Sequence, residues 1–183
     1  ALVDVRGVIV DARQRGLLTP ASNPVDELVA RLEKARHDPA VKAVVLRIES
    51  PGGAVGASQE IYEAVRGLDA VKPVVASIGN IGASGGYYSA LGARRIWALP
   101  GSLTGSIGVI TQFTDFHGLM EKVGVRSEVV KSGEMKDAGS PWRAMNDKEK
   151  ALFQTMVLDV YAQFREVVSE RRKVDSAALD SLA

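Results

Sequence analysis

Residues 80–88 read Asn-Ile-Gly-Ala-Ser-Gly-Gly-Tyr-Tyr and join a predicted strand to a predicted helix. The β-branched run at 73–78 is typical of a buried strand, and residues 88–93 predict a short helix. Ser84 therefore lies on a strand-to-helix turn, where free backbone N–H groups gather. Both a nucleophile and the oxyanion that it creates need such surroundings.

Gly82 and Gly86 flank Ser84 two positions away on each side, a spacing related to the Gly-x-Ser-x-Gly turn of hydrolases. Small residues around a serine also occur in tight turns that have no chemistry. The motif alone does not separate these two interpretations, so the rest of the chain has to do so.

The composition is that of one ordinary globular domain: 183 residues, 46% of them hydrophobic and 25% charged. The formal net charge of +1 gives no electrostatic case for binding nucleic acid. The absence of cysteine excludes disulfides, thiolate metal sites and cysteine nucleophiles. With His37 and His117 as the only histidines, the sequence also argues against a multi-histidine metal site.

No apolar run approaches the roughly 20 residues that span a bilayer, and no signal peptide is visible. The chain opens without Met in strand-like sequence and ends within a helical pattern. We therefore expect a single domain over 1–183 that is trimmed at both ends, which leaves open a membrane anchor outside it.

Alternating strand and helix patterns in the first half predict an α/β fold with a parallel sheet. Strands are expected at 2–10, 41–48 and 73–78, and helices from Asn23-Pro24 to Pro39 and over 55–68, with a loop at 16–22. The strand at 41–48 contains a run that is apolar on both faces, which is typical of a sheet covered on both sides. Since ligands collect at the carboxyl ends of parallel strands, the glycine loops at 50–53 and 82–86 are expected to face each other.

The second half predicts shorter elements and one long helix. Strands are expected at 94–99, 107–110 and 125–130, a helix at 114–123 that starts at Thr114 and stops at Gly124, and a polar loop at 131–142. A helix that begins at Asp147 has an apolar stripe, which we interpret as core or as a subunit contact. Its members are Phe153, Met156, Val157, Val160, Phe164, Val167 and Val168.

The chemistry of an acyl transfer needs oxyanion donors and a base. Gly53 and Gly85 could each offer a backbone N–H to an oxyanion, although Ser-Pro-Gly-Gly at 50–53 is also an ordinary turn.

The candidates for the base are histidine and lysine side chains. His37 and His117 are interpreted as structural. A lysine must lose its proton to serve, so its pKa must fall from about 10.4 by roughly 3 units. Lys136 lies in a loop that ends in a Trp, but on this argument alone an exposed loop lysine is the better interpretation.

Four motifs occur in order along the chain: Ser-Pro-Gly-Gly at 50–53, Gly-Ala-Ser-Gly-Gly-Tyr-Tyr at 82–88, Thr-Gly-Ser-Ile-Gly-Val at 104–109 and Ser-Gly-x-x-Lys-Asp-Ala-Gly-Ser-Pro at 132–141. Each is weak alone, but together they are specific. With them the sequence resembles bacterial signal peptide peptidase A over nearly the whole chain.

The resemblance implies a serine peptidase with a Ser-Lys dyad on a crotonase/Clp-protease-like fold of repeated ββα units. Ser84 falls on the nucleophile, Lys136 on the general base and Ser106 on a serine that hydrogen-bonds the lysine. Gly53 and Gly85 fall on the oxyanion donors. No cofactor is implied.

The resemblance also implies partners and a location. Substrates would be remnant signal peptides and other unfolded apolar peptides. Short members of the family form a homo-oligomeric ring in which Ser and Lys come from neighbouring subunits, and the catalytic domain is anchored on the extracytoplasmic side of the cell membrane. Two alternatives stay open: a crotonase-type acyl-CoA enzyme, and a non-catalytic scaffold that binds membrane-protein segments.

Overall fold

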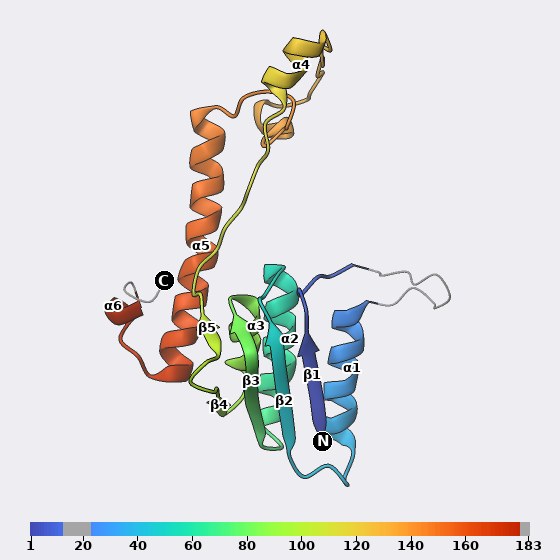
Figure 1. The fold of residues 1–183 in the computed structure, drawn as a ribbon, viewed down its shortest axis with the longest axis vertical. Helices are drawn as coiled ribbons and strands as arrows, with labels where there is room; N and C mark the ends of the chain where they lie inside the picture. The colour runs from blue at the N-terminus through green and yellow to red at the C-terminus, as the bar shows by residue number, and fades with distance from the viewer. Residues whose placement is uncertain (13–22, 180–183) are drawn as a thin grey trace. The chain divides into compact units, whose positions relative to one another are not determined.

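The computed structural model describes residues 1–12 and 23–179, which form two compact units. Unit 1 comprises Ala1–Gly108 with Phe164–Ala183, and unit 2 comprises Val109–Gln163. Figure 1 shows the order of their elements along the chain. The loop predicted at 16–22 lies outside the described residues.

Unit 1 is built on a parallel β-sheet in the strand order β1-β2-β3-β4, and β5 also pairs with β3. The predicted α/β class with helices on a parallel sheet is confirmed, while the finer crotonase/Clp-like assignment stays a prediction. The strands are β1 (Leu2–Arg6), β2 (Val44–Ser50), β3 (Val74–Ala83), β4 (Arg95–Trp97) and β5 (Leu103–Gly105).

Three helices of unit 1 alternate with its first strands: α1 (Pro24–His37), α2 (Val55–Asp69) and α3 (Gly85–Ala90). The predicted start of α1 is confirmed, because the Asn23 side chain accepts a hydrogen bond from the Val25 N–H at 3.1 Å. Helix α3 begins three residues earlier than the predicted helix at 88–93. Because glycine is a poor helix former, the sequence pattern did not indicate that α3 begins with Gly85 and Gly86.

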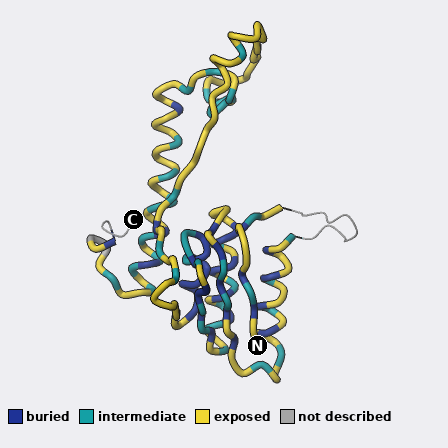
Figure 2. The backbone as a smooth tube through the Cα atoms, in the orientation of Figure 1, coloured by how far each residue is buried: buried dark blue, intermediate teal, exposed yellow. Residues whose placement is uncertain are grey.

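One face of the sheet lies against the helices and forms the core. Alternate residues of β2 point into it, namely Val44, Leu46 and Ile48, and each is at most 1% exposed. Burying one such side chain contributes about 1.5–3 kcal/mol. The same cluster includes Leu32, Ile61, Val65 and Leu68 of the helices, and Figure 2 shows these buried segments in dark blue.

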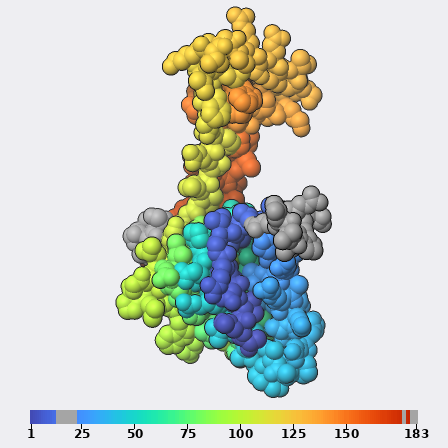
Figure 3. Space-filling view, turned by 45° about the vertical axis from the view of Figure 1, so that its right-hand side comes forward, coloured from blue at the N-terminus to red at the C-terminus, as the bar shows by residue number. Residues whose placement is uncertain are grey.

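The opposite face of the sheet is partly open. Val45 of β2 is 42% exposed, and Leu2 and Trp97 are more exposed still. In the space-filling view of Figure 3, β1 (dark blue) forms surface beside α1 (lighter blue). The prediction that both faces of the sheet are covered was therefore wrong for the described residues. An apolar run in a strand does not reveal which face of the sheet other elements cover.

Unit 2 contains α4 (His117–Val123), the 3₁₀ helix η1 (Glu134–Asp137) and the first part of α5 (Asp147–Arg172). The prediction that Gly124 stops α4 is confirmed, since Gly124 adopts a left-handed conformation with φ of 71°. The predicted start at Thr114 was wrong: α4 starts at His117, whose N–H donates to Asp115 Oδ1 at 2.8 Å.

Two predicted strands do not form. Residues 107–110 leave the sheet because the chain turns at Ser106, with φ of 51°, and β5 forms just before it. Residues 125–130 have no strand partner, and Val130 is fully exposed. A strand without a neighbour leaves its backbone groups unpaired, so β-branched composition alone was not sufficient.

The long helix predicted from Asp147 is confirmed as α5, and α6 (Ser176–Leu179) follows it. The apolar stripe divides along its length. Phe164 and Val168 are buried in unit 1, where the Phe164 ring lies 4.9 Å from that of Tyr88. Met156, in unit 2, is 54% exposed. No helix within residues 1–12 and 23–179 is both long and apolar enough to cross a bilayer.

Candidate active site

Ser84 occupies a strained turn between β3 and α3. Its φ of 50° and ψ of −123° lie outside the regions that non-glycine residues ordinarily adopt. Such a conformation costs about 1–3 kcal/mol and persists where its surroundings enforce it. Here the Ser84 N–H donates to the Gly105 carbonyl at 2.9 Å, and the Ser84 carbonyl accepts from the Tyr88 N–H at 2.8 Å. Among the described residues the half-buried hydroxyl makes no hydrogen bond.

The two glycine loops face each other across a gap too narrow for side chains. A Cβ added at Gly52 would lie 2.5 Å from the Gly85 nitrogen and 2.9 Å from the Ser84 Cβ. A Cβ added at Gly85 would lie 3.3 Å from the Gly53 nitrogen. The predicted juxtaposition of the loops is thus confirmed, and glycine is required there because the two backbones approach so closely.

The N–H groups of Gly53 and Gly85 have no hydrogen-bond acceptor among the described residues. Gly53 is held from its other side by the segment that continues β1. The Ile9 N–H donates to the Gly52 carbonyl at 2.9 Å, and the Ala54 N–H donates to the Ile9 carbonyl at 2.8 Å. The Ser50 hydroxyl accepts from the Gly52 N–H at 3.1 Å. Two free donors are therefore fixed beside Ser84.

Glu49 stabilises the irregular end of β3, and sequence reasoning missed it. The register of β2 and β3 shifts between Ile48 and Ser50. The Glu49 carboxylate accepts from the N–H groups of Asn80, at 3.0 Å, and Ile81, at 3.2 Å. These hydrogen bonds hold the pKa of Glu49 below its ordinary value. Its position next to the Ser-Pro-Gly-Gly motif was the signal that could have drawn attention to it.

Ser106 lies directly after β5, whose last residue Gly105 pairs with Ala83 of β3. The hydrogen bond from Ser84 to Gly105 thus ties the turn at Ser84 to the strand that leads into Ser106. Ser106 itself is exposed and has a φ of 51°. Unit 1 therefore contains four of the five predicted site residues, namely Ser84, Ser106, Gly53 and Gly85.

Lys136, the fifth predicted residue, lies in η1 of unit 2 and is exposed. It differs from its neighbours in having no carboxylate partner among the described residues. The other cations of 131–150 all form ion pairs: Lys131 with Asp137, Arg143 with Asp137 and Glu149, Lys148 with Glu134, and Lys150 with Asp147.

The two histidines lie on helices and pair with glutamates one turn away. His117 Nε2 lies 3.5 Å from Glu121 in α4. His37 Nε2 lies 3.4 Å from Glu33 in the last turn of α1. Their predicted structural roles are consistent with these contacts. No group of three or more potential metal ligands occurs among the residues that the structure describes.

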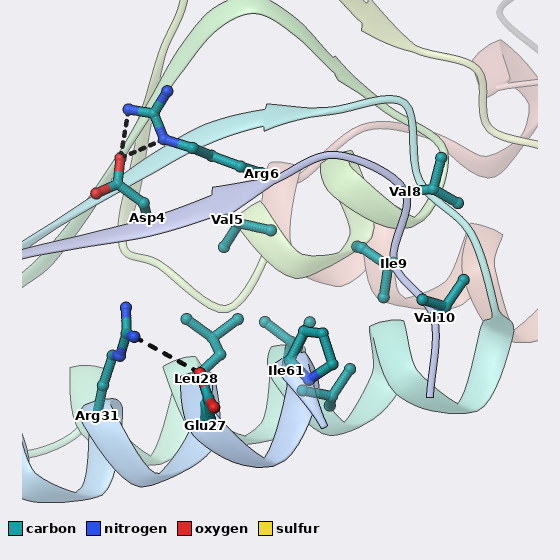
Figure 4. Close-up of a pocket in the computed structure, with 12 residues that line it drawn as sticks. Asp4, Val5, Arg6, Val8, Ile9, Val10, Glu27, Leu28, Arg31 and Ile61 are labelled. Atoms are coloured by element: carbon teal, nitrogen blue, oxygen red, sulfur yellow. Dashed lines mark hydrogen bonds and ion pairs between the residues drawn. The ribbon is translucent and has the colours of Figure 1, made fainter. Parts of the chain in front are cut away.

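A cavity of about 240 Å³ lies between β1 and α1 in unit 1. Figure 4 shows Val5, Leu28 and Ile61 among the residues that line it, together with two ion pairs, Arg6 with Asp4 and Arg31 with Glu27. Ser84 does not line this cavity. The cavity adjoins the Gly53 loop through Ile9, which lines it and also pairs with Gly53.

Comparisons with known proteins bear on this geometry. The profile described as Peptidase family S49 matches residues 66–183, a range that includes Ser84, Ser106 and Lys136. The chain is 35% identical, over 99% of its length, to a putative signal peptide peptidase SppA of Enterococcus faecium. It is 38% identical, over 95% of its length, to the putative protease slr0021 of Synechocystis. It is also 35% identical over its whole length to Protease 4 of Haemophilus influenzae.

The chain spans only part of these relatives: 53% of the Enterococcus protein, 58% of the Synechocystis protein and 29% of the Haemophilus protein. The similarity nevertheless runs through both units and through the turn at Ser84. From the profile match and from these identities, the chain belongs to peptidase family S49.

Proposed function

We propose that this protein is a serine peptidase that works through an acyl-enzyme on Ser84. The observation that supports this most is the strained turn at Ser84, which faces two backbone N–H groups without acceptors, those of Gly53 and Gly85. A peptide carbonyl whose oxygen accepts from both donors would gain negative charge on that oxygen when the hydroxyl attacks. Membership of a peptidase family supports the same chemistry.

The proposed base is Lys136, which makes a Ser-Lys dyad with Ser84. Neutral Lys136 takes the proton from the Ser84 hydroxyl as the oxygen bonds to the peptide carbon. The C–N bond then breaks, and the lysine gives its proton to the leaving amine. Water adds to the ester, the lysine takes and returns a proton again, and Ser84 is regenerated with a free carboxylic acid product. Ser106 is proposed to hydrogen-bond the lysine.

The substrates that we propose are remnant signal peptides and other unfolded apolar segments, met by a protein anchored on the extracytoplasmic side of the membrane. The printed name of the Enterococcus relative supports this substrate class. An extended segment suits a site made of backbone donors, because those donors bind the main chain of a peptide whatever its sequence.

We also propose a homo-oligomeric ring in which neighbouring subunits complete each site. Unit 2 supports this through its exposed apolar side chains, which a partner copy would cover. They are Ile110, Leu119, Val123, Val125, Val129 and Val130, each more than half exposed.

Labelling with a fluorophosphonate, followed by intact-mass spectrometry, tests the proposal on wild type, Ser84→Ala and Lys136→Ala. One adduct on the wild type that is lost in both variants is the expected result. Circular dichroism checks that the variants are folded, and a sizing run shows whether labelling follows assembly. An adduct that persists in Lys136→Ala would refute the dyad. A well-assembled wild type without an adduct would favour an acyl-CoA enzyme or a peptide-binding scaffold, and binding of a CoA thioester or of an apolar peptide would separate these two.

A further inference from the structure

Lys136 is surrounded in sequence by carboxylates. Glu134 lies two residues before it and Asp137 directly follows it, all within η1. A carboxylate free to approach a lysine favours the charged ammonium form. A lysine that must be neutral to take a proton therefore needs its neighbouring carboxylates occupied by other cations.

The structure provides those cations. Asp137 accepts from Lys131 Nζ at 2.5 Å and from Arg143, with Nε at 2.9 Å from Oδ2 and Nη2 at 2.9 Å from Oδ1. Glu134 accepts from Lys148 Nζ at 3.0 Å. The Arg143 guanidinium and then the Lys131 ammonium hold the pKa of Asp137 well below its usual range. The carboxylates beside Lys136 are thus paired, and the lysine is not.

Arg143 is itself fixed at the start of α5. Glu149, which is 0% exposed, accepts from both Nη1, at 2.9 Å, and Nη2 of Arg143. Glu149 and Asn146 also cap the helix reciprocally: the Asn146 N–H donates to the Glu149 carboxylate at 3.0 Å, and the Glu149 N–H donates to Asn146 Oδ1 at 2.9 Å. A bidentate guanidinium held in this way has little freedom to move.

The same guanidinium reaches the main chain next to the lysine. Arg143 Nη2 donates to the Asp137 carbonyl at 3.2 Å, in addition to its bonds to the Asp137 side chain. Arg143 therefore connects the buried Glu149 to both the backbone and the carboxylate of the residue that follows Lys136.

We propose that Arg143, anchored by Glu149, is a positioning residue for the reaction: it fixes the η1 segment and occupies Asp137, so that Lys136 is available as a neutral base. The inference rests on the proposed role of Lys136. The ion pairs around this segment link Lys131, Glu134, Asp137, Arg143, Lys148 and Glu149, and Asp147 and Lys150 pair with each other.

The test is the pH dependence of the rate of fluorophosphonate labelling. The wild-type rate is expected to rise with pH to a plateau, which defines a midpoint. In Arg143→Gln, Asp137 is released to pair with Lys136, so the midpoint of the rise is expected to move up by about one pH unit, which lowers the rate at neutral pH about tenfold. Adding Asp137→Asn to Arg143→Gln is expected to return the midpoint close to that of the wild type.

Lys150→Gln is the matched control. Lys150 lies in the first turns of α5, and its Nζ lies 3.5 Å from Asp147 Oδ1 in a largely exposed ion pair. Removing this pair should leave the midpoint of the rate unchanged. Arg143→Gln leaves the buried Glu149 carboxylate without its partner and could prevent folding. The double variant Arg143→Gln/Glu149→Gln removes both charges, and it replaces the single variant if that variant does not fold. The same upward shift is expected from it.

The outcomes separate the two proposals. A uniform loss of rate at all pH values, with no shift of the midpoint, would show a merely structural role and overturn this inference while the dyad stands. Failure of Asp137→Asn to reverse the shift would also overturn it. A wild type that is not labelled, or is labelled equally well as Lys136→Ala, would refute the proposed function, and this inference with it.

Discussion

The two units of this chain are stabilised by different forces. Unit 1 has an apolar core, in which Leu46 and Ile48 are 0% exposed among other aliphatic side chains. In unit 2, all of which the structure describes, the single buried residue is a carboxylate, Glu149. The contacts that connect the segments of unit 2 include ion pairs such as that of Arg143 with Glu149 and two aromatic contacts, Phe113 with Phe153 and Phe116 with Trp142.

The backbone differs in the same way. Among the described residues, the non-glycine residues with positive φ all lie in unit 1, namely Ser84, Ser106 and Lys173, whereas unit 2 has positive φ only at Gly124 and Gly139. A close-packed core can hold a strained turn in place, because relaxing the turn would disturb many contacts. Unit 2 has no such core, and ion pairs connect its segments instead. The comparison suggests which perturbation should affect each unit.

The largest effect is expected from the core of unit 1. Leu46→Ala should lower the free energy of unfolding by about 3 kcal/mol, since it removes buried methyl groups and leaves a cavity. Urea denaturation measures this. Val45→Ala on the same strand is the control: Val45 is 42% exposed on the open face, so its loss should cost less than about 1 kcal/mol. Equal losses would show that the two faces of β2 are not different.

Acid should act first on unit 2. The pKa values of Asp137 and Glu149 lie below their ordinary values of 3.8 and 4.5, chiefly because both carboxylates accept hydrogen bonds from Arg143. A lowered pKa in the folded state stabilises the fold above the ordinary value, and this stabilisation is lost as pH falls below it. Unit 2 should therefore begin to lose structure below a pH of about 4.

The two tryptophans allow this to be measured, because Trp97 lies in unit 1 and Trp142 in unit 2. In a Trp97→Phe variant, the fluorescence of Trp142 reports unit 2 alone. As the pH is lowered, this fluorescence should change at a higher pH than the far-ultraviolet circular dichroism of the whole chain. Coincident transitions would contradict the idea that ion pairs stabilise unit 2 selectively.

The strain at Ser84 predicts a smaller difference in stability between two variants of this residue. Ser84→Gly should be more stable than Ser84→Ala by about 1 kcal/mol, because glycine adopts a φ of 50° without a steric penalty. Thermal unfolding of the two variants, side by side, measures it. A more stable alanine variant would show that the turn relaxes once the hydroxyl is gone.

The smallest effect is expected at the rim of unit 2. Lys148→Gln breaks an ion pair with Glu134 in which both side chains are more than 60% exposed. Such pairs contribute about 0.2–1 kcal/mol at most, and salt screens them. The melting temperature should change little, and any change should vanish in 1 M salt. A large, salt-resistant loss would contradict this expectation.

Local patterns predicted much of unit 1. Asn23 and Pro24 predicted the start of α1 because a capping side chain and a fixed φ act within one turn of the chain. The facing glycine loops followed from the parallel order of the strands. The strand expected at 107–110 failed because the conformation of Ser106 depends on neighbours distant in sequence, and 125–130 failed because a strand needs a partner.

The network around Arg143 was not predicted. Its ion pairs depend on how the loop between η1 and α5 folds back, and residue spacing does not show this. One local signal was present: Asn146 and Glu149 have the three-residue spacing of a helix capping box. That pattern predicts a helix start, but it does not reveal that the same glutamate is buried and bound to an arginine.

The burial of Glu149 constrains how this sequence can change through descent. Losing Arg143 alone leaves an uncompensated charge in a dry site, and losing Glu149 alone removes one of the two carboxylates that hold the guanidinium. Replacing both by apolar residues of similar volume is often neutral for stability. Replacing this ion pair one residue at a time therefore passes through a less stable protein, whereas replacing both residues together does not. Positions 143 and 149 are therefore expected to change together during evolution.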